Sequence, residues 1–167
     1  MAKYSFLFCK LTPPLQGEIV MEINNDCIRD ILKYCIKNID YVEYSVNSWR
    51  EKSVSLHELY SDEKLRKYKK KVIMYSVKKL YENNFIVVTN ITPAGKEKEY
   101  IDNCYIVDVT INGHNFYNSI EDDTVWNKTK NIISRAGNHT LKFIEDTAQM
   151  VAVASAKQMV TVMMTKN

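Results

Sequence analysis

Apolar side chains recur at spacings of three and four along several stretches of the chain, which is the pattern of helices with one buried face. The first such stretch follows the sequence Asn-Asn-Asp at residues 24–26, whose side chains suit a helix N-terminus. Ser55 and Glu58 have the spacing of a capping box and predict a short helix over residues 56–60. Between these helices, residues 41–46 are β-prone and are expected to form a strand or a loop. The apolar face of the first helix would consist of Ile28, Ile31, Leu32, Cys35, Ile36 and Ile39.

A strongly basic stretch with helical spacing is followed by two stretches with the residue types of β-strands. Residues 64–79 carry eight basic side chains and no acidic one, and apolar residues recur at helical spacing in their second half, which predicts a basic helix. Residues 85–89 and 105–110 are instead rich in β-branched and aromatic side chains. A polar loop containing Gly and Pro separates them, which predicts a hairpin with a long connection.

Three further helical segments are predicted after the hairpin. Asn112 and Gly113 are expected to break the period before a helix that begins at His114. The next helix would be capped by an acidic or hydroxyl side chain within residues 122–124 and ended by Gly137. Residues 141–164 predict a last, long helix.

The order short helix, turn, long helix and hairpin is that of a winged helix-turn-helix. We therefore predict an α+β fold, a winged helix-turn-helix with a two-stranded wing followed by C-terminal helices. Residues 21–112 would form the winged-helix domain and residues 113–167 a C-terminal helical extension. Residues 1–20 would be either an N-terminal arm packed on the domain or a leader before a natural start at Met21. The codons of residues 16–18 can include a purine-rich ribosome-binding sequence, which supports a leader.

The charged side chains are unevenly distributed along the chain, which bears on the kind of partner that it binds. The chain has 167 residues, 46% of them apolar, which suffices for one domain with a sizeable core. Its net charge is only +3, but residues 64–79 alone contribute +8, so the rest of the chain sums to −5. This asymmetry indicates one face built for an anionic partner.

Double-stranded DNA is the anionic partner that a winged helix-turn-helix would bind. Lys and Arg contacts to phosphate supply most of the affinity, and the N-terminal half of the second helix enters the major groove. Arg66 is the best candidate for a base contact, because its guanidinium fork pairs with guanine. The alternative interpretation is a solvated, Lys-rich helix face without a ligand. The predicted DNA-binding residues are Lys64, Arg66, Lys67, Tyr68, Lys70 and Lys71 in the helix and Lys96 and Lys98 in the wing.

Titratable side chains show no pattern of a metal or catalytic site. The histidines, at positions 57, 114 and 139, lie far apart and have no Cys or carboxylate at ligand spacing. Asp122 and Asp123 are more simply explained as helix caps than as cation ligands. No nucleophile arrangement and no phosphate-binding Gly loop is present in the sequence. We therefore predict no cofactor, no metal and no enzymatic activity.

The cysteines and the hydropathy pattern predict where in the cell the protein is located. Cys9, Cys27, Cys35 and Cys104 form no CxxC pair, which favours reduced thiols in a cytoplasmic protein. No stretch reaches the ~20 apolar residues needed to span a bilayer, so no membrane partner is expected.

The last predicted helix suits close contacts between helices. A two-fold homodimer through it would place two reading helices on adjacent half-sites of DNA. Packing onto the chain's own winged domain explains the same residues equally well, and both interpretations stay open. Its small side chains are Ala148, Ala152, Ala154, Ser155 and Ala156, and its adaptable ones are Met150, Met159, Met163 and Met164.

Three stretches together resemble a family of small phage and prophage proteins, common in low-GC Gram-positive bacteria and known only as a domain of unknown function. They are residues 24–32 (NNDCIRDIL), 74–86 (MYSVKKLYENNFI) and 111–128 (INGHNFYNSIEDDTVWNK). The pair Gly-His-x-Phe and Asp-Thr-x-Trp-x-Lys in the last stretch is the most specific part. The resemblance implies a winged-helix-like fold and no established activity. Many members have Gly where this chain has Asn84, a residue that also tolerates the left-handed conformation.

These observations predict a non-enzymatic, phage-derived protein that binds duplex DNA and regulates transcription in a prophage. The alternative is a protein-interaction module that uses the basic helix or the last helix to engage or inhibit a host or defence factor. Affinity that falls steeply with salt would favour the first hypothesis, whereas salt-independent affinity would count against it.

Overall fold

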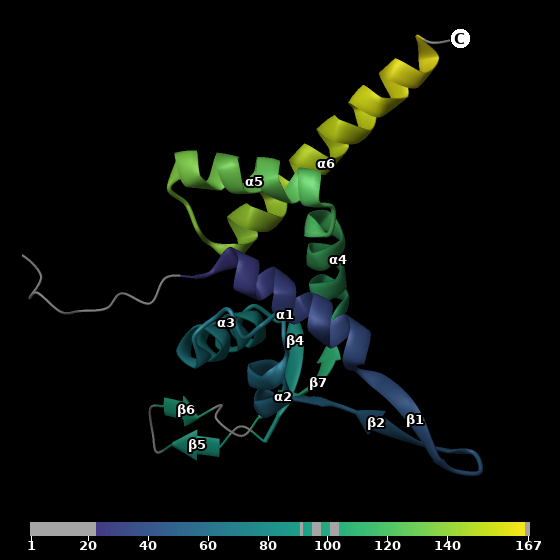
Figure 1. Ribbon diagram of the computed structural model, residues 1–167, viewed down its shortest axis with the longest axis vertical. Helices are drawn as coiled ribbons and strands as arrows, with labels where there is room; N and C mark the ends of the chain where they lie inside the picture. Colours follow the sequence, from purple (N-terminus) through teal and green to yellow (C-terminus); the bar gives the residue numbers. More distant parts are fainter. Residues whose placement is uncertain (1–22, 91, 95–97, 101–103, 166–167) are drawn as a thin grey trace, which may run out of the picture.

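The first helix lies at the centre of the molecule and packs against elements that come later in the chain (Figure 1). A computed structural model describes residues 23–90, 92–94, 98–100 and 104–165, and of residues 92–94 and 98–100 it describes the backbone. The helix α1 (Asn25–Asn38) begins as predicted, because the Asn24 Oδ1 atom accepts a hydrogen bond of 2.9 Å from the Cys27 amide. It packs against α3, α4 and β7, and its buried residues are Cys27, Ile28, Ile31, Leu32 and Cys35.

A small antiparallel sheet lies against α1. The strands β4 (Ile86–Thr89) and β7 (Tyr105–Val109) pair antiparallel, which confirms the predicted hairpin. The strand β3 (Val54–Ser55) pairs with the other edge of β7, so the sheet has the order β3-β7-β4. A second pair, β5 (Thr92–Ala94) and β6 (Lys98–Tyr100), lies within the connection between β4 and β7.

Two helices precede the β4–β7 hairpin. The short helix α2 (Leu56–Ser61) has the predicted capping box, in which the Ser55 hydroxyl accepts from the Glu58 amide and Glu58 accepts from the Ser55 amide. The helix α3 (Lys70–Glu82) buries Ile73, Ser76, Val77 and Leu80 against the core. The prediction that this helix starts at Lys64 is wrong, because residues 62–69 form turns.

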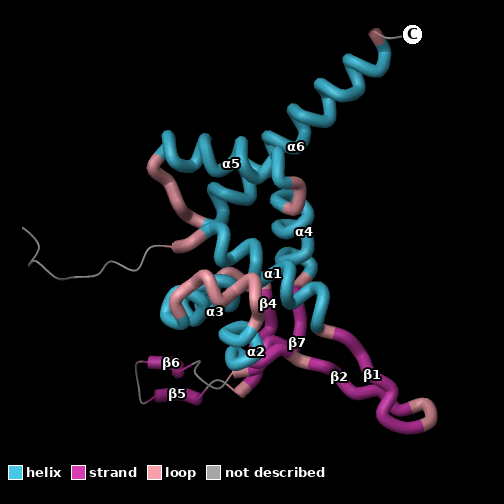
Figure 2. Tube along the Cα trace, in the orientation of Figure 1, coloured by secondary structure: helices cyan, strands magenta, loops and turns pink. Residues whose placement is uncertain are grey.

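A hairpin between α1 and β3 was not predicted as such. The strands β1 (Asp40–Ser45) and β2 (Ser48–Lys52) pair antiparallel around a turn in which Asn47 has φ +59°. Every residue of both strands is exposed, and Figure 2 shows the hairpin projecting from the body of the protein.

Three helices complete the chain: α4 (Ile111–Ile120), α5 (Asp123–Ala136) and α6 (Leu141–Met164). The Asp122 side chain caps α5, and Gly137 ends it with a φ of +65°, as the sequence predicts. The helix α6 packs on α4 and α5 over its first half, and its second half extends beyond them (Figure 1). Phe116, Trp126 and Ile144 share one core with α1 and α3.

The glycine at position 113 does not break a helix, and that prediction is wrong. Gly113 is buried inside α4, and a Cβ atom there would lie 2.1 Å from the carbonyl oxygen of Phe85. The residue is therefore a point of close approach between α4 and the start of β4. Thr110 fixes this junction, because its hydroxyl donates to the Asn84 carbonyl and accepts from the Gly113 amide.

The α+β class is confirmed, with helices around small antiparallel sheets. No helix in the described part of the chain has the length and apolar character to cross a membrane.

Candidate nucleic-acid interface

The turn that precedes α3 is shaped by two inward-pointing side chains. Leu65 is buried, and the Tyr68 hydroxyl donates a hydrogen bond of 2.8 Å to the Asp30 carboxylate on α1. The Asp62 carboxylate accepts hydrogen bonds from the amides of Lys64 and Leu65, and Lys69 has an extended backbone. These contacts and the extended Lys69 interrupt the helical backbone, so the helix begins only at Lys70.

The N-terminus of α3 is surrounded by cations. Its N-cap residue is Lys69, which makes no side-chain cap, and its first turn contains no acidic residue. The first amides of such a helix lack intrahelical partners and carry the positive end of the helix dipole. The other helices of the described chain have side-chain caps. The exposed basic residues at this end are Lys64, Arg66, Lys67, Lys69, Lys70 and Lys71.

Several of the predicted DNA-binding side chains have contacts within the protein. The Lys67 ammonium lies 2.7 Å from the Asp30 carboxylate, which offsets its charge. The Arg66 Nε–H group donates to the Ser61 carbonyl at 3.0 Å. The Lys70 ammonium lies over the Tyr60 ring, 5.4 Å from its centroid, in a cation–π contact.

The far end of α3 contributes less positive charge than the sequence implies. Glu82 lies 2.6 Å from the Lys79 ammonium and 3.7 Å from that of Lys78. The hydrogen bond that the Lys79 ammonium donates to Glu82 raises the pKa of Lys79, which keeps this pair ionised. The positive field of the basic stretch is therefore concentrated at the N-terminus of α3 and in the preceding turn.

Tyr68 has a structural role in this surface. Burial, followed by its hydrogen bond to Asp30, raises the pKa of the Tyr68 phenol far above its ordinary value. The phenol therefore stays protonated and donates to the carboxylate, which fixes the turn on α1.

Of the two predicted wing lysines, the structure describes the backbone of Lys98. Lys98 is the first residue of β6, within the connection between β4 and β7. Lys96 lies outside the described residues. In the view of Figure 1 the β5–β6 pair lies below α3, on the same side of the picture.

The residues that carry the family resemblance at 123–128 join α5 to α1. The indole Nε1–H of the buried Trp126 donates to the Asp26 carboxylate at 2.7 Å, and the Lys130 ammonium contacts the same carboxylate at 3.0 Å. Arg29 pairs with Asp123 at 2.7 Å. Partial burial raises the pKa of Asp26, but hydrogen bonds from Trp126 and Lys130 outweigh it, so the pKa lies below its ordinary value. This cluster is a clamp between two helices.

The His, Asp and Glu side chains of the described residues are dispersed, and the cysteines there are buried. No group of three His, Cys, Asp or Glu side chains in that part of the chain is arranged to hold a metal ion. Burial raises the pKa of the Cys27 thiol to about 11 and that of Cys35 to about 12, so both stay protonated near neutral pH.

Sequence reasoning missed the exposed aromatic side chains of the β1–β2 hairpin. Tyr41, Tyr44 and Trp49 are 62%, 74% and 63% exposed. Neither face of the hairpin is buried, so the strands lack a regular polar and apolar alternation. Asn47 in the turn, with β-prone residues on both sides, is the signal that could have indicated the hairpin.

Residues 22–139 match the model of a protein family described as "Hypothetical protein (DUF2513)". The chain belongs to this family. No curated protein and no solved structure matches the chain. The DUF2513 match includes the basic turn, α3 and the clamp at Trp126, and it ends before α6 begins.

Proposed function

We propose that this DUF2513 protein is a winged helix-turn-helix protein that binds duplex DNA without catalysis. The order α1, β3, α2, α3 and the β4–β7 hairpin supports the winged-helix assignment. In this arrangement α3 is the reading helix and the connection between β4 and β7 is the wing. A DNA partner also agrees with the predicted cytoplasmic location.

The observation that carries this proposal is the charge at the start of α3. Lys64, Lys69, Lys70 and Lys71 are exposed and form no ion pair among the described residues. Lys69, Lys70 and Lys71 stand at a helix N-terminus without a side-chain cap, where free amides favour phosphate oxygens. The phosphates of a nucleic-acid backbone match the sign of this charge.

The side chains would have different roles in the complex. Lys64, Lys70 and Lys71 would contact phosphates, and Arg66 would reach a base edge with its terminal N–H groups. Lys67 and Tyr68, which are held by Asp30, would position the turn. Lys96 and Lys98 would contact the backbone from the wing.

A regulator of prophage transcription is the biological role that we propose for this DNA binding. The resemblance to phage and prophage proteins supports it. A two-fold dimer through α6 would place two copies of α3 on adjacent half-sites.

The test measures binding of a random-sequence duplex by fluorescence anisotropy over a series of salt concentrations. Changing Lys64, Lys70 and Lys71 to Glu is expected to lower the slope of log affinity against log salt by about 3, because each phosphate contact contributes about 0.9. The matched control changes Lys33, Lys37 and Lys52 to Glu. These lysines are exposed on α1 and β2, so the same change in net charge should leave most of the slope intact. A folded triple variant that binds DNA as tightly as the wild type, with the same slope, would refute the proposal.

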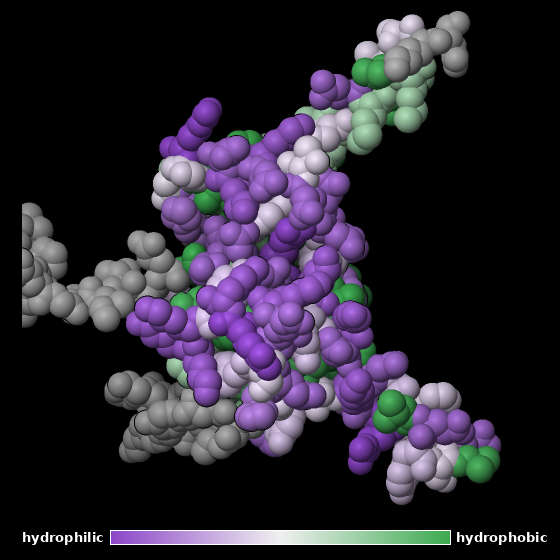
Figure 3. Space-filling model, in the orientation of Figure 1, coloured by the Kyte–Doolittle hydropathy of each residue, from purple (hydrophilic) through white to green (hydrophobic). Residues whose placement is uncertain are grey.

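The exposed hairpin favours a second candidate function, engagement or inhibition of a host or defence protein. Tyr and Trp are the residues that most often dominate protein interfaces, and the β1–β2 hairpin presents three of them to solvent. Figure 3 shows apolar side chains at the tip of this projecting arm. Changing Tyr44 and Trp49 to Ser should abolish capture of a host protein from nuclease-treated lysate while DNA binding persists. Capture that is unchanged would exclude the hairpin as the binding surface.

A further inference from the structure

The last helix extends well beyond the body of the protein. The helix α6 has 24 residues, which corresponds to about 36 Å, and its buried residues all lie between Leu141 and Val151. No residue from Ala152 to Thr165 is buried. Figures 1 and 3 show residues 152–164, here named the α6 tail, projecting from the other helices as a less polar surface.

The α6 tail exposes a largely apolar surface to water. Lys157 is its one charged residue, while Met159, Met163 and Met164 are 58%, 69% and 76% exposed. A contiguous exposed apolar surface of this kind, with so little charge, is typical of a site that binds a partner.

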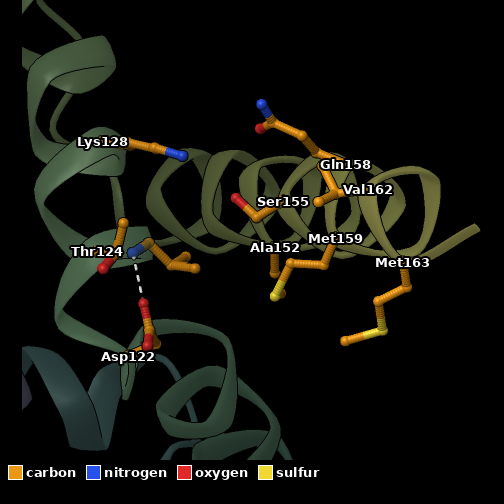
Figure 4. A pocket seen from close by; sticks show the side chains of 10 residues that line it. Asp122, Thr124, Lys128, Ala152, Ser155, Gln158, Met159, Val162 and Met163 are labelled. Carbon is orange, nitrogen blue, oxygen red and sulfur yellow. Dashed lines mark hydrogen bonds between the residues drawn. The ribbon is translucent and has the colours of Figure 1, made fainter. Parts of the chain in front are cut away.

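A charge-free stripe runs along one side of the tail. Ala152, Ala156, Met159 and Met163 follow each other at spacings of four, three and four, which places them on one helix face. Figure 4 shows Ala152, Met159 and Met163 directed to the same side of α6. Three residues of this stripe, Ala152, Met159 and Met163, line one wall of a groove of about 780 Å³. The other wall includes Asp122, Val125 and Lys128 near the start of α5.

The order of small and large side chains in this stripe suits an antiparallel pair of two identical helices. Two small residues, Ala152 and Ala156, come first, and two large ones, Met159 and Met163, follow at the same spacing. When a second copy of the stripe runs antiparallel to the first, each alanine faces a methionine. Ala152 then lies opposite Met163 of the second copy, and Ala156 lies opposite Met159. A parallel pair would instead place alanine on alanine and leave gaps.

Charge supports the same antiparallel arrangement. The last turn of α6 contains no basic residue, and its terminal carbonyls carry the partial negative end of the helix dipole. In the antiparallel pair this end reaches the groove of the second copy, where the Lys128 side chain is exposed. The Asp122 carboxylate at the same groove already accepts a hydrogen bond from the Val125 amide.

We propose that the α6 tail is a dimerisation element that pairs antiparallel with the tail of a second copy of this chain. The stripe contributes four residues from each copy, fewer than the roughly 20–30 residues a side of a standard interface, so the dissociation constant should be micromolar or weaker. The inference does not depend on DNA binding, and its tests use the protein alone.

Sedimentation velocity across the micromolar range tests the dimer. The wild-type chain is expected to shift from monomer to dimer as concentration rises. Met159→Lys should stay monomeric with an unchanged circular dichroism spectrum, because Met159 is exposed in the single chain. The matched control Thr161→Lys adds the same charge to the opposite side of the tail and should dimerise normally. The proposal is overturned if the wild type stays monomeric, or if Met159→Lys dimerises as the wild type does. It is also overturned if a monomeric chain binds phosphatidylcholine vesicles through the tail.

Oxidative cross-linking tests the orientation. Ala152→Cys and Met163→Cys are prepared separately in a Cys9→Ser background, in which the remaining cysteines are buried. In the antiparallel pair a disulfide forms only when the two variants are mixed, because two copies of position 152 lie about 16 Å apart along the axis. Efficient cross-linking of either variant with itself would overturn the antiparallel arrangement.

Discussion

Replacing Gly113 by alanine is expected to destabilise the fold, although alanine is the better helix former. Gly113 lies inside α4, where the change to alanine normally contributes about 1 kcal/mol of helix stability. Here the new Cβ would lie 2.1 Å from the Phe85 carbonyl oxygen and 2.8 Å from the Val109 Cγ1 atom. Ordinary contacts begin at 3.4 Å, so α4 must move by more than an ångström from the start of β4.

The magnitude follows from these two opposing effects. Overpacking of a core costs about 1–3 kcal/mol, and the upper end applies because the obstacle is backbone. After the gain in helix propensity, the free energy of unfolding should fall by about 2 kcal/mol. For a chain of this size that change lowers the melting temperature by about 4–8 °C.

Urea unfolding followed by circular dichroism measures the effect, with Asn118→Ala as the control. Asn118 is exposed on the same helix, so its replacement should leave stability unchanged or slightly higher. The stacked rings of Phe85 and Phe116, whose centroids lie 4.9 Å apart, should also be disturbed in Gly113→Ala. A Gly113→Ala protein that is as stable as the wild type would refute the close approach as the reason for glycine at this position.

Three further predictions concern the contacts of α1. Trp126→Phe should lower the free energy of unfolding by about 2 kcal/mol in urea titrations, because Asp26 loses a buried donor. The pKa of Asp26 lies below its ordinary 3.8 in the folded protein, so its contribution to stability is complete above that value and is lost as pH falls through the lower folded pKa. Asp26→Asn should therefore make the free energy of unfolding less dependent on pH in the acid range. An unchanged pH dependence would contradict this prediction. Tyr68→Phe should cost about 1 kcal/mol of stability by removing the hydrogen bond to Asp30, yet leave the salt dependence of DNA binding unchanged.

Local signals in the sequence predict most of the helices well. The caps at Asn24, Ser55 and Asp122 and the left-handed Gly137 are determined by residues within a few positions of each helix end. Asn84, expected to tolerate a left-handed conformation, has a φ of +57°. Such features depend on short-range hydrogen bonds, which a sequence pattern records directly.

The features that sequence reasoning missed depend on distant residues. Gly113 resembles a helix breaker until the Phe85 carbonyl is placed beside it. The turn before α3 replaces a helical turn because Tyr68 reaches Asp30, 38 positions earlier in the chain. The Asp30 carboxylate also forms an ion pair with Lys67. A count of basic residues therefore overestimates the positive charge that is available to a ligand.

The basic N-terminus of α3 also affects the stability of the free protein. Lys69, Lys70 and Lys71 stand at the positive end of a helix dipole, where cations are unfavourable. A bound polyanion would relieve this repulsion, so the protein is expected to be most stable when the surface is occupied. Under the proposed DNA-binding function, these three lysines would therefore favour anion binding while they destabilise the free fold.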